Sequence, residues 1–244
     1  MNHVRGFTLI ELAIVLVIIT FLIGGLAMPL SAQIQARRVA ETKKTLEEAK
    51  EAIVGYAMTH KTPGATPRPY LPCPDIDGDG REDRVANPGA CSRSDGYFPW
   101  VDLGGAAQDA WGNRLGYVVE LSVADSTSGF FSYPVIPASN WKQIASARGC
   151  ATVDVAANLP YLLISHGANG WGALNVNGNT LAAPTGADEI ENLVDDPATQ
   201  DDDACYVSRT PSKPGEAAGE FDDIVAWLSL GTLISRVCPA GGCP

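Results

Sequence analysis

One apolar segment near the N-terminus constrains this chain more than any other feature. From Phe7 to Met28 the only charged side chain is Glu11, in a run of about 22 residues. A helix rises about 1.5 Å per residue, so such a run is long enough to cross the roughly 30 Å hydrocarbon core of a bilayer. No later stretch is comparably apolar. The sequence therefore predicts one membrane span over residues 7–30 and a water-soluble remainder.

Charge divides the chain near residue 61. Residues 1–61 carry seven Lys and Arg against five Glu, whereas residues 62–244 carry ten basic residues against twenty-three acidic ones. The second segment therefore has a net charge of −13, and the whole chain one of −11. A domain this acidic repels phosphate backbones, so we expect no nucleic-acid partner.

The cysteines indicate that the remainder lies on the oxidising side of the membrane. Their number is even, none forms a C-x-x-C pair, and only three histidines accompany them, which favours disulfides over a zinc site. Short loops close most easily, which favours the pairs Cys73–Cys91 and Cys238–Cys243 and leaves Cys150–Cys205. Other pairings remain open at this point. The six cysteines all lie beyond the apolar segment: Cys73, Cys91, Cys150, Cys205, Cys238 and Cys243.

Glu11 is difficult to explain in a plain membrane anchor. A carboxylate inside a membrane helix costs on the order of 3 kcal/mol on insertion scales. An ordinary signal peptide does not explain the segment either, because its apolar core is about 7–15 residues long and is followed by a small-residue cleavage site. A different kind of N-terminal segment is needed.

The stretch GFTLIEL at residues 6–12 supplies one. It resembles the cleavage and methylation motif of type IV prepilins and type II secretion pseudopilins. The resemblance implies that a prepilin peptidase of the inner membrane cuts between Gly6 and Phe7 and N-methylates Phe7. Residues 1–6 would then be a cleaved leader, and the apolar helix would remain in the mature protein.

The resemblance also implies a role for Glu11 in assembly. Cleavage creates a positive amino group on Phe7, and a buried carboxylate is tolerated when an opposite charge pairs with it. In the family, this glutamate is thought to meet the terminal amine of a neighbouring subunit. The implied partners are other pilin or pseudopilin subunits, the prepilin peptidase and an inner-membrane assembly platform. The implied location is the inner membrane, with the N-terminus in the cytoplasm, and then a periplasmic or extracellular filament.

A helical pattern continues beyond the apolar segment to about residue 61. Its apolar side chains recur at helical spacing and form one stripe, which predicts an amphipathic spine over residues 31–61. The segment Thr62-Pro63-Gly64 ends it. The stripe consists of Val39, Leu46, Ala49, Ile53 and Ala57.

Residues 62–244 are expected to form one acidic domain. They contain short strand-like runs separated by turn-rich segments, and Ser229–Val237 is expected to be a short closing helix. We therefore predict an α+β fold in which the long N-terminal helix packs against an antiparallel sheet, as in pilins. The strand-like runs are Leu115–Leu121, Tyr133–Ile136, Thr152–Val155, Tyr161–Ser165, Tyr206–Ser208 and Ile224–Leu228.

Two looser resemblances lie inside this domain. The segment DAWGNRLGY at residues 109–117 is similar to a turn before the first sheet strand of many pseudopilins. The segments LPCP at residues 71–74, GYFPW at 96–100 and FDDIV at 221–225 resemble minor-pilin-like proteins of Gram-negative bacteria. The chain is also larger than a typical major pilin, which favours a minor subunit.

The segment DIDGDGRED at residues 75–83 suggests a calcium loop. Calcium loops place ligands at positions 1, 3, 5, 7 and 9, and Asp75, Asp77, Asp79 and Asp83 occupy positions 1, 3, 5 and 9. Position 12 departs from the pattern because it holds Ala86 instead of a bidentate glutamate. The alternative interpretation is a surface turn closed by a Cys73–Cys91 disulfide.

Catalytic patterns are missing from the sequence. There is no G-x-S-x-G, no H-E-x-x-H and no phosphate loop. His3 would be lost with the leader, which leaves His60 and His166. We expect His166 to be a loop residue. We therefore expect a structural subunit without enzymatic activity. The alternative is a single-pass, membrane-anchored domain that binds calcium, recognises a ligand and does not polymerise, although it does not explain Glu11.

Overall fold

A computed structural model describes residues 8–130, 141–194 and 204–238, apart from the side chains of residues 24–29. The chain divides into two compact units, residues 1–40 and 41–244. Its helices and strands confirm the predicted α+β class. Because the second unit begins at Glu41, the later part of the predicted spine belongs to the same compact unit as the acidic domain.

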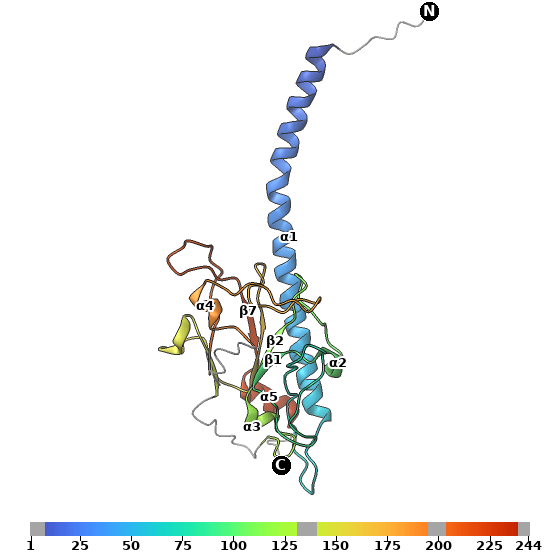
Figure 1. The fold of residues 1–244 in the computed structure, drawn as a ribbon, viewed down its shortest axis with the longest axis vertical. Helices are drawn as coiled ribbons and strands as arrows, with labels where there is room; N and C mark the ends of the chain where they lie inside the picture. Colours follow the sequence, from blue (N-terminus) through green and yellow to red (C-terminus); the bar gives the residue numbers. More distant parts are fainter. Residues whose placement is uncertain (1–7, 131–140, 195–203, 239–244) are drawn as a thin grey trace, which may run out of the picture. The chain divides into compact units, whose positions relative to one another are not determined.

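Helix α1 spans Leu9–Thr59 (Figure 1). Leu, Ala, Glu and Lys are good helix formers and dominate it. In the first unit its large apolar side chains are exposed, with Leu9 89% and Phe21 78% accessible. Within the described residues, no helix combines the length and the hydropathy that a bilayer span requires. The span expected over residues 7–30 remains a prediction.

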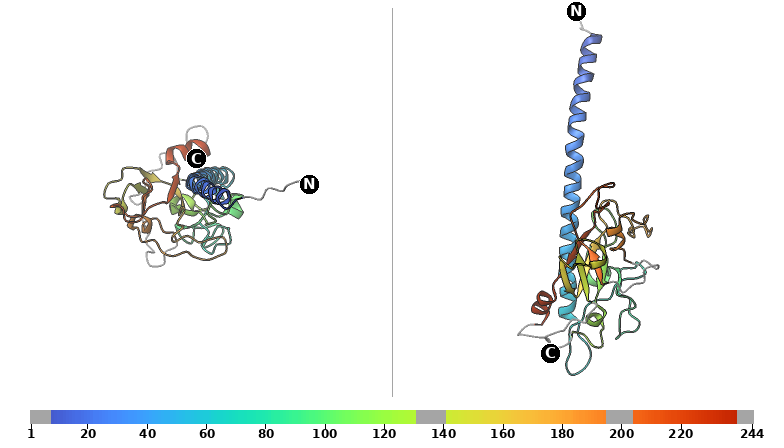
Figure 2. Two further views of the ribbon diagram at one scale, coloured as in Figure 1. Left: turned by 90° about the horizontal axis from the view of Figure 1, so that it is seen from above. Right: turned by 90° about the vertical axis from the view of Figure 1, so that its left-hand side faces the viewer.

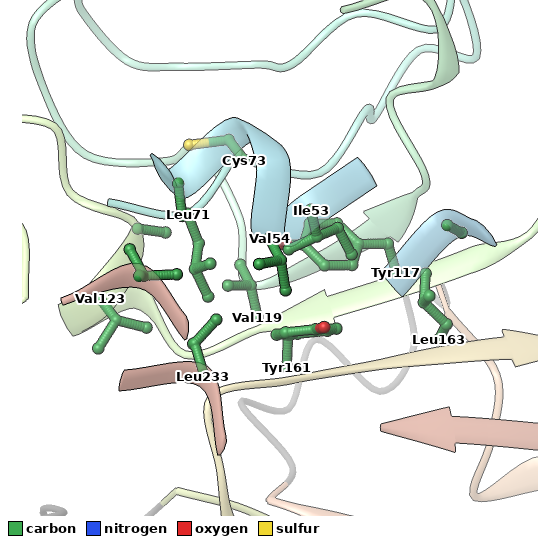
Figure 3. Packing of buried hydrophobic residues seen from close by; sticks show 14 of the residues in the cluster. Ile53, Val54, Leu71, Cys73, Tyr117, Val119, Val123, Tyr161, Leu163 and Leu233 are labelled. Carbon is green, nitrogen blue, oxygen red and sulfur yellow. The ribbon is translucent and has the colours of Figure 1, made fainter. Parts of the chain in front are cut away.

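In the second unit, α1 buries the predicted stripe. Leu46, Ala49, Ile53 and Ala57 are at most 2% exposed, whereas Val39 lies in the first unit and is half-buried. Fully burying a Leu or Ile side chain contributes about 1.5–3 kcal/mol, so this stripe is a main source of stability. Figure 3 shows where these side chains go: Ile53 and its neighbour Val54 lie among residues of the sheet and of the loop that follows the helix.

The partner of this stripe is a four-stranded antiparallel sheet. Its strands are β1 (Asp95–Tyr97), β2 (Gly116–Val119), β5 (Tyr161–Ser165) and β7 (Ile224–Trp227), in the order β1-β2-β5-β7. The view on the right of Figure 2 shows these strands beside the C-terminal part of α1.

Successive side chains along these strands point to opposite faces of the sheet, and each face contributes to a different apolar cluster. Tyr117 and Leu163, which are direct register partners, face the helix. Val118 and Leu162, the next register pair, face away into the second cluster. Both faces of the sheet are therefore buried.

The second cluster is covered by a separate three-stranded sheet, which the sequence did not indicate. Its strands are β3 (Lys142–Ala145), β4 (Ala156–Leu159) and β6 (Cys205–Val207), in the order β4-β3-β6. Strands β3 and β4 are antiparallel, but β6 runs parallel to β3. A parallel pair requires a long connection between its strands. Here the connection contains β4, β5 and the helix α4 (Ala187–Ile190).

Most of the predicted strand-like runs overlap observed strands. This holds for β2, β5, β6 and β7, while Tyr133–Ile136 lies outside the described residues and Thr152–Val155 immediately precedes β4. The short helices are α2 (Trp100–Leu103), α3 (Leu121–Ala124), η1 (Arg148–Cys150), α4 (Ala187–Ile190) and α5 (Leu230–Val237). Helix α5 matches the expected closing helix, and the Ser229 hydroxyl caps it by accepting the Thr232 amide.

Two disulfides join segments of the second unit. They are Cys73–Cys91, which proximity in the sequence favoured, and Cys150–Cys205, the pair that then remained. Cys238 is also disulfide-bonded, and Cys243 lies outside the described residues. The Cys150–Cys205 bond ties the start of β6 to η1, next to β3, and so supports the parallel pair.

Candidate functional site

The N-terminal segment ends in a capping box at the start of α1. Thr8 directly precedes the helix, and its amide and hydroxyl both donate to Glu11 Oε2, at 2.8 and 2.9 Å. The Glu11 amide in turn donates to the Thr8 hydroxyl, at 3.3 Å. These are the reciprocal bonds that satisfy free amides at a helix N-terminus. Gly6 and Phe7, the predicted cleavage and methylation residues, lie outside the described residues.

Glu11 therefore has a local role that the sequence interpretation missed. The signal for it was present, because a Thr followed three residues later by a Glu is the sequence signature of a capping box. The carboxylate sits in the first turn, where the helix dipole also favours negative charge. The same two effects would favour a carboxylate there in any chain that begins its helix at this point.

The acidic loop brings together three of its four predicted calcium ligands. Carboxylate oxygens of Asp75, Asp77 and Asp83 lie within 4.8 Å of one another, and Asp79 is outside this group. Asp75 is fully buried. The loop is closed by the Cys73–Cys91 disulfide, as the alternative interpretation of a clipped turn required.

Backbone amides of this loop donate hydrogen bonds to the loop's own carboxylates. Asp75 accepts the amides of Gly78 and Gly80 at 2.7 and 2.9 Å, and Asp77 accepts that of Asp79 at 3.1 Å. Asp83 accepts the Ile76 amide from across the loop, at 2.7 Å. Gly80 has a φ of +89° and lies against Trp100, so the sharp turn at this sixth position requires glycine.

The charge of the loop is incompletely balanced. Burial raises the pKa of Asp75, and the negative charges of Asp77 and Asp79 raise it as well. The hydrogen bonds from the two glycine amides lower it, and the net result is a pKa of about 6. Arg81 pairs with Asp102 at 3.2 Å instead of with the clustered carboxylates. A calcium ion would offset this excess of negative charge with the oxygen ligands that it prefers.

A second carboxylate group was not anticipated from the sequence. Oxygens of Glu189, Asp222 and Asp223 lie within 4.8 Å of one another. Glu189 Oε1 accepts the Asp222 amide and the Asn169 side chain, whereas Glu189 Oε2 and Asp222 Oδ1 are buried and have no hydrogen-bond partner among the described residues. Burial raises the pKa of Glu189, and it raises the pKa of Asp222 to about 6. Glu189 is more than 30 residues from the adjacent pair Asp222 and Asp223, so spacing could not reveal the group.

His166 lies beside this second group. It follows β5 in a loop, as expected, but it is only 1% exposed. Its Nδ1 is 3.5 Å from Asp223 Oδ1, and neither ring nitrogen has a hydrogen-bond partner within the described part of the chain. Burial lowers the pKa of His166, but Asp223, Asp109 and Glu189 together raise it by more. When protonated, the imidazole would balance part of the buried negative charge.

The other histidine is in a structural position. The ring of His60 stacks on that of Tyr56, with centroids 3.8 Å apart, and the Tyr56 hydroxyl donates to Glu82 at 2.9 Å. Burial raises the pKa of Tyr56 well above its usual range. This arrangement closes the end of α1 against the acidic loop.

Comparison with known proteins locates one similarity. Residues 1–27 match the family described as the prokaryotic N-terminal methylation motif. No match was found among curated proteins or among solved structures. The matched segment contains the predicted cleavage site, the capping box and the exposed apolar part of α1.

Proposed function

We propose, from the match of residues 1–27 to the N-terminal methylation motif, that the chain is a type IV pilin- or pseudopilin-like protein and serves as a structural subunit, a minor pilin or pseudopilin. A prepilin peptidase would remove residues 1–6 and methylate Phe7. An inner-membrane platform would then assemble the subunit with other pilins into a periplasmic or extracellular filament. The proposal assigns no catalytic role to the chain.

The observation that carries the proposal is that the matched segment combines the predicted cleavage site with an exposed apolar helix. Leu9, Leu16, Phe21 and Ile23 are each more than 60% exposed in the single chain. Apolar surface of this extent is unfavourable in water and is typical of an interaction site. A membrane would cover it before assembly, and neighbouring helices would cover it in a filament.

Glu11 connects the two states. In the precursor its carboxylate caps its own helix through Thr8. In a filament we propose that it pairs with the amino group of Phe7 on a neighbouring subunit, which is created only by cleavage. The pairing would offset the cost of burying the carboxylate in the filament core.

Substitutions at the capping box separate these roles. Glu11→Gln keeps a side chain that can cap the helix but removes the negative charge. Thr8→Ala keeps the charge and removes the cap, at a cost of about 1 kcal/mol to the helix end. We expect Glu11→Gln to insert normally and to be strongly depleted from the sheared filament fraction, and Thr8→Ala to be affected less.

Three results would contradict this account. Recovery of Glu11→Gln in filaments at the wild-type level would remove the role of the charge. Depletion of Thr8→Ala alone would reduce Glu11 to a helix cap. If the wild-type chain is processed and never enters filaments, the alternative of an anchored, non-polymerising, ligand-binding domain is the better description.

A second proposal concerns calcium at the loop of residues 75–83. Three observations favour it: the grouped oxygens of Asp75, Asp77 and Asp83, the turn at Gly80, and the unbalanced charge. Asp79 would complete the set by moving one side chain. The role of the ion would be to hold this loop in its native shape.

Calcium should then stabilise the folded state by mass action, because the unfolded loop offers no preformed cage. The full-length chain in detergent should melt several degrees higher in millimolar calcium than in chelator, and magnesium should substitute poorly. Asp77→Ala combined with Asp79→Ala should abolish the difference. A calcium response that survives in that variant and disappears in Asp223→Asn would place the ion at the second carboxylate group instead.

A further inference from the structure

The two sheets of the second unit have four outer edges, and two of these are closed. Beyond β1, Asp75 and Tyr97 exchange backbone hydrogen bonds at 2.9 and 2.7 Å. Beyond β6, the side chain of Asn192 donates to the Val207 carbonyl and accepts the Val207 amide. Native proteins cover edges in this way because unpaired strands recruit other strands.

Among the residues that the structure describes, the edge of β7 is open. Its backbone pairs with β5 on one side, and on the other the described residues provide only a long contact of 3.5 Å from Lys50 Nζ to the Trp227 carbonyl. Strand β7 lies beside α1 (Figure 1), and a groove of about 300 Å³ separates the edge of the strand from the helix. The groove is lined by Leu46, the β7 residues, and the basic side chains of Lys43 and Lys50, which flank Glu47.

The edge of β4 is open as well. It pairs with β3, and its outer side has no backbone partner among residues 8–130, 141–194 and 204–238. Ala157 is exposed, and the approach to the strand presents Val153 and Val155, each 37% exposed, on either side of Asp154. Asn158 has a positive φ of 56°, so the extended part of this edge ends at Ala157.

We propose that the β7 edge of one copy receives residues 153–157 of a neighbouring copy as an added strand. The inference rests on the proposed filament function and identifies a contact between subunits in it. Strand addition gives affinity through backbone hydrogen bonds and specificity through alternate side chains. Because the two edges differ, the contact is head-to-tail, the type that builds open assemblies instead of closed dimers.

The two surfaces are complementary. In an extended segment Val153, Val155 and Ala157 share one face, which fits the apolar wall that Leu46 and Ala226 provide. The acidic surface of the domain as a whole favours this groove, whose two basic side chains, Lys43 and Lys50, outnumber its one carboxylate, Glu47. The chain supplies both halves of the contact, so a second copy is a sufficient partner.

Disulfide trapping in filaments of the full-length chain tests the contact. Ala226→Cys would be combined separately with Val155→Cys and with Ala157→Cys, which cover two registers of the added strand. Paired cysteines form a bond when their Cα atoms are about 4.4–6.8 Å apart. At least one combination should give a ladder of covalent multimers on a non-reducing gel, and a reductant should collapse it.

The matched control is Ala226→Cys with Ala156→Cys, because Ala156 points to the opposite face of β4. It should give no ladder, and each single variant should remain monomeric. Absence of a ladder in both test pairs, with filaments recovered at wild-type yield, would overturn the contact and leave the filament function intact. A dimer formed by Ala226→Cys alone would also overturn it, because it indicates a symmetric β7 contact. If wild-type filaments do not form, the inference falls together with the function on which it rests.

Discussion

Asp222 has a pKa raised to about 6, from an ordinary value of 3.8, because it is buried beside Asp223 and Glu220. The pKa of Asp75, in the acidic loop, is also raised to about 6. A carboxyl with a raised pKa binds a proton more tightly in the folded state than in the unfolded state. Protonation between about pH 6 and pH 4 therefore stabilises the fold, and that contribution is lost as the pH rises through 6.

This gives a sign for the pH dependence of the variant Asp222→Asn. The new amide is neutral at all pH values and can point its nitrogen to the carboxylate of Glu189. In calcium-free buffer we expect the variant to be more stable than the wild type at pH 7, by several degrees of melting temperature, and the gap to be smaller at pH 5. Thermal unfolding at the two pH values measures it.

Asp154→Asn is the control for this comparison. Bonds from Ser146 lower the pKa of Asp154, so the same substitution there should lower stability at pH 7. A gap between Asp222→Asn and the wild type that is constant from pH 5 to pH 7 would show that Asp222 does not titrate in this range.

Among the elements, those with a regular apolar pattern were predictable from the sequence. The stripe of α1 has helical spacing, and β5 is a continuous apolar run, so both appear at the expected residues. Strands β1 and β3 were missed because they are short, and DGY and KQIA carry no alternating pattern. The parallel position of β6 depends on a disulfide and on the clamp from Asn192, neither of which is a local property of the strand.

The packing of α1 against the sheet predicts a large effect at Ile53. It is fully buried among Val54, Tyr117 and other residues of the first apolar cluster. Ile53→Ala should destabilise the second unit by about 2–5 kcal/mol through lost burial and the cavity that remains. Met58→Ala, at a position 54% exposed on the same helix, should cost much less. Chemical denaturation of the full-length variants in detergent measures both free energies of unfolding. Equal losses in the two variants would show that the packing of α1 against the sheet does not stabilise the second unit.

At the scale of the whole molecule, the candidate sites differ in how far the sequence could reveal them. The methylation motif and the loop of residues 75–83 are continuous in sequence, so residue types and spacing were sufficient to find them. The group of Glu189, Asp222 and Asp223 forms only when two segments more than 30 residues apart fold together, and its unpartnered oxygens are visible only in the structure. The edges of β4 and β7 are likewise consequences of sheet order.

The account depends most on processing at the N-terminus. Intact-mass analysis of the protein from cells with an active prepilin peptidase should find a chain that lacks residues 1–6, begins at Phe7 and is heavier by one N-methyl group. Gly6→Val should block the cut and give the full-length mass in the same cells. A wild-type protein that retains Met1 in those cells would contradict the pilin-like function.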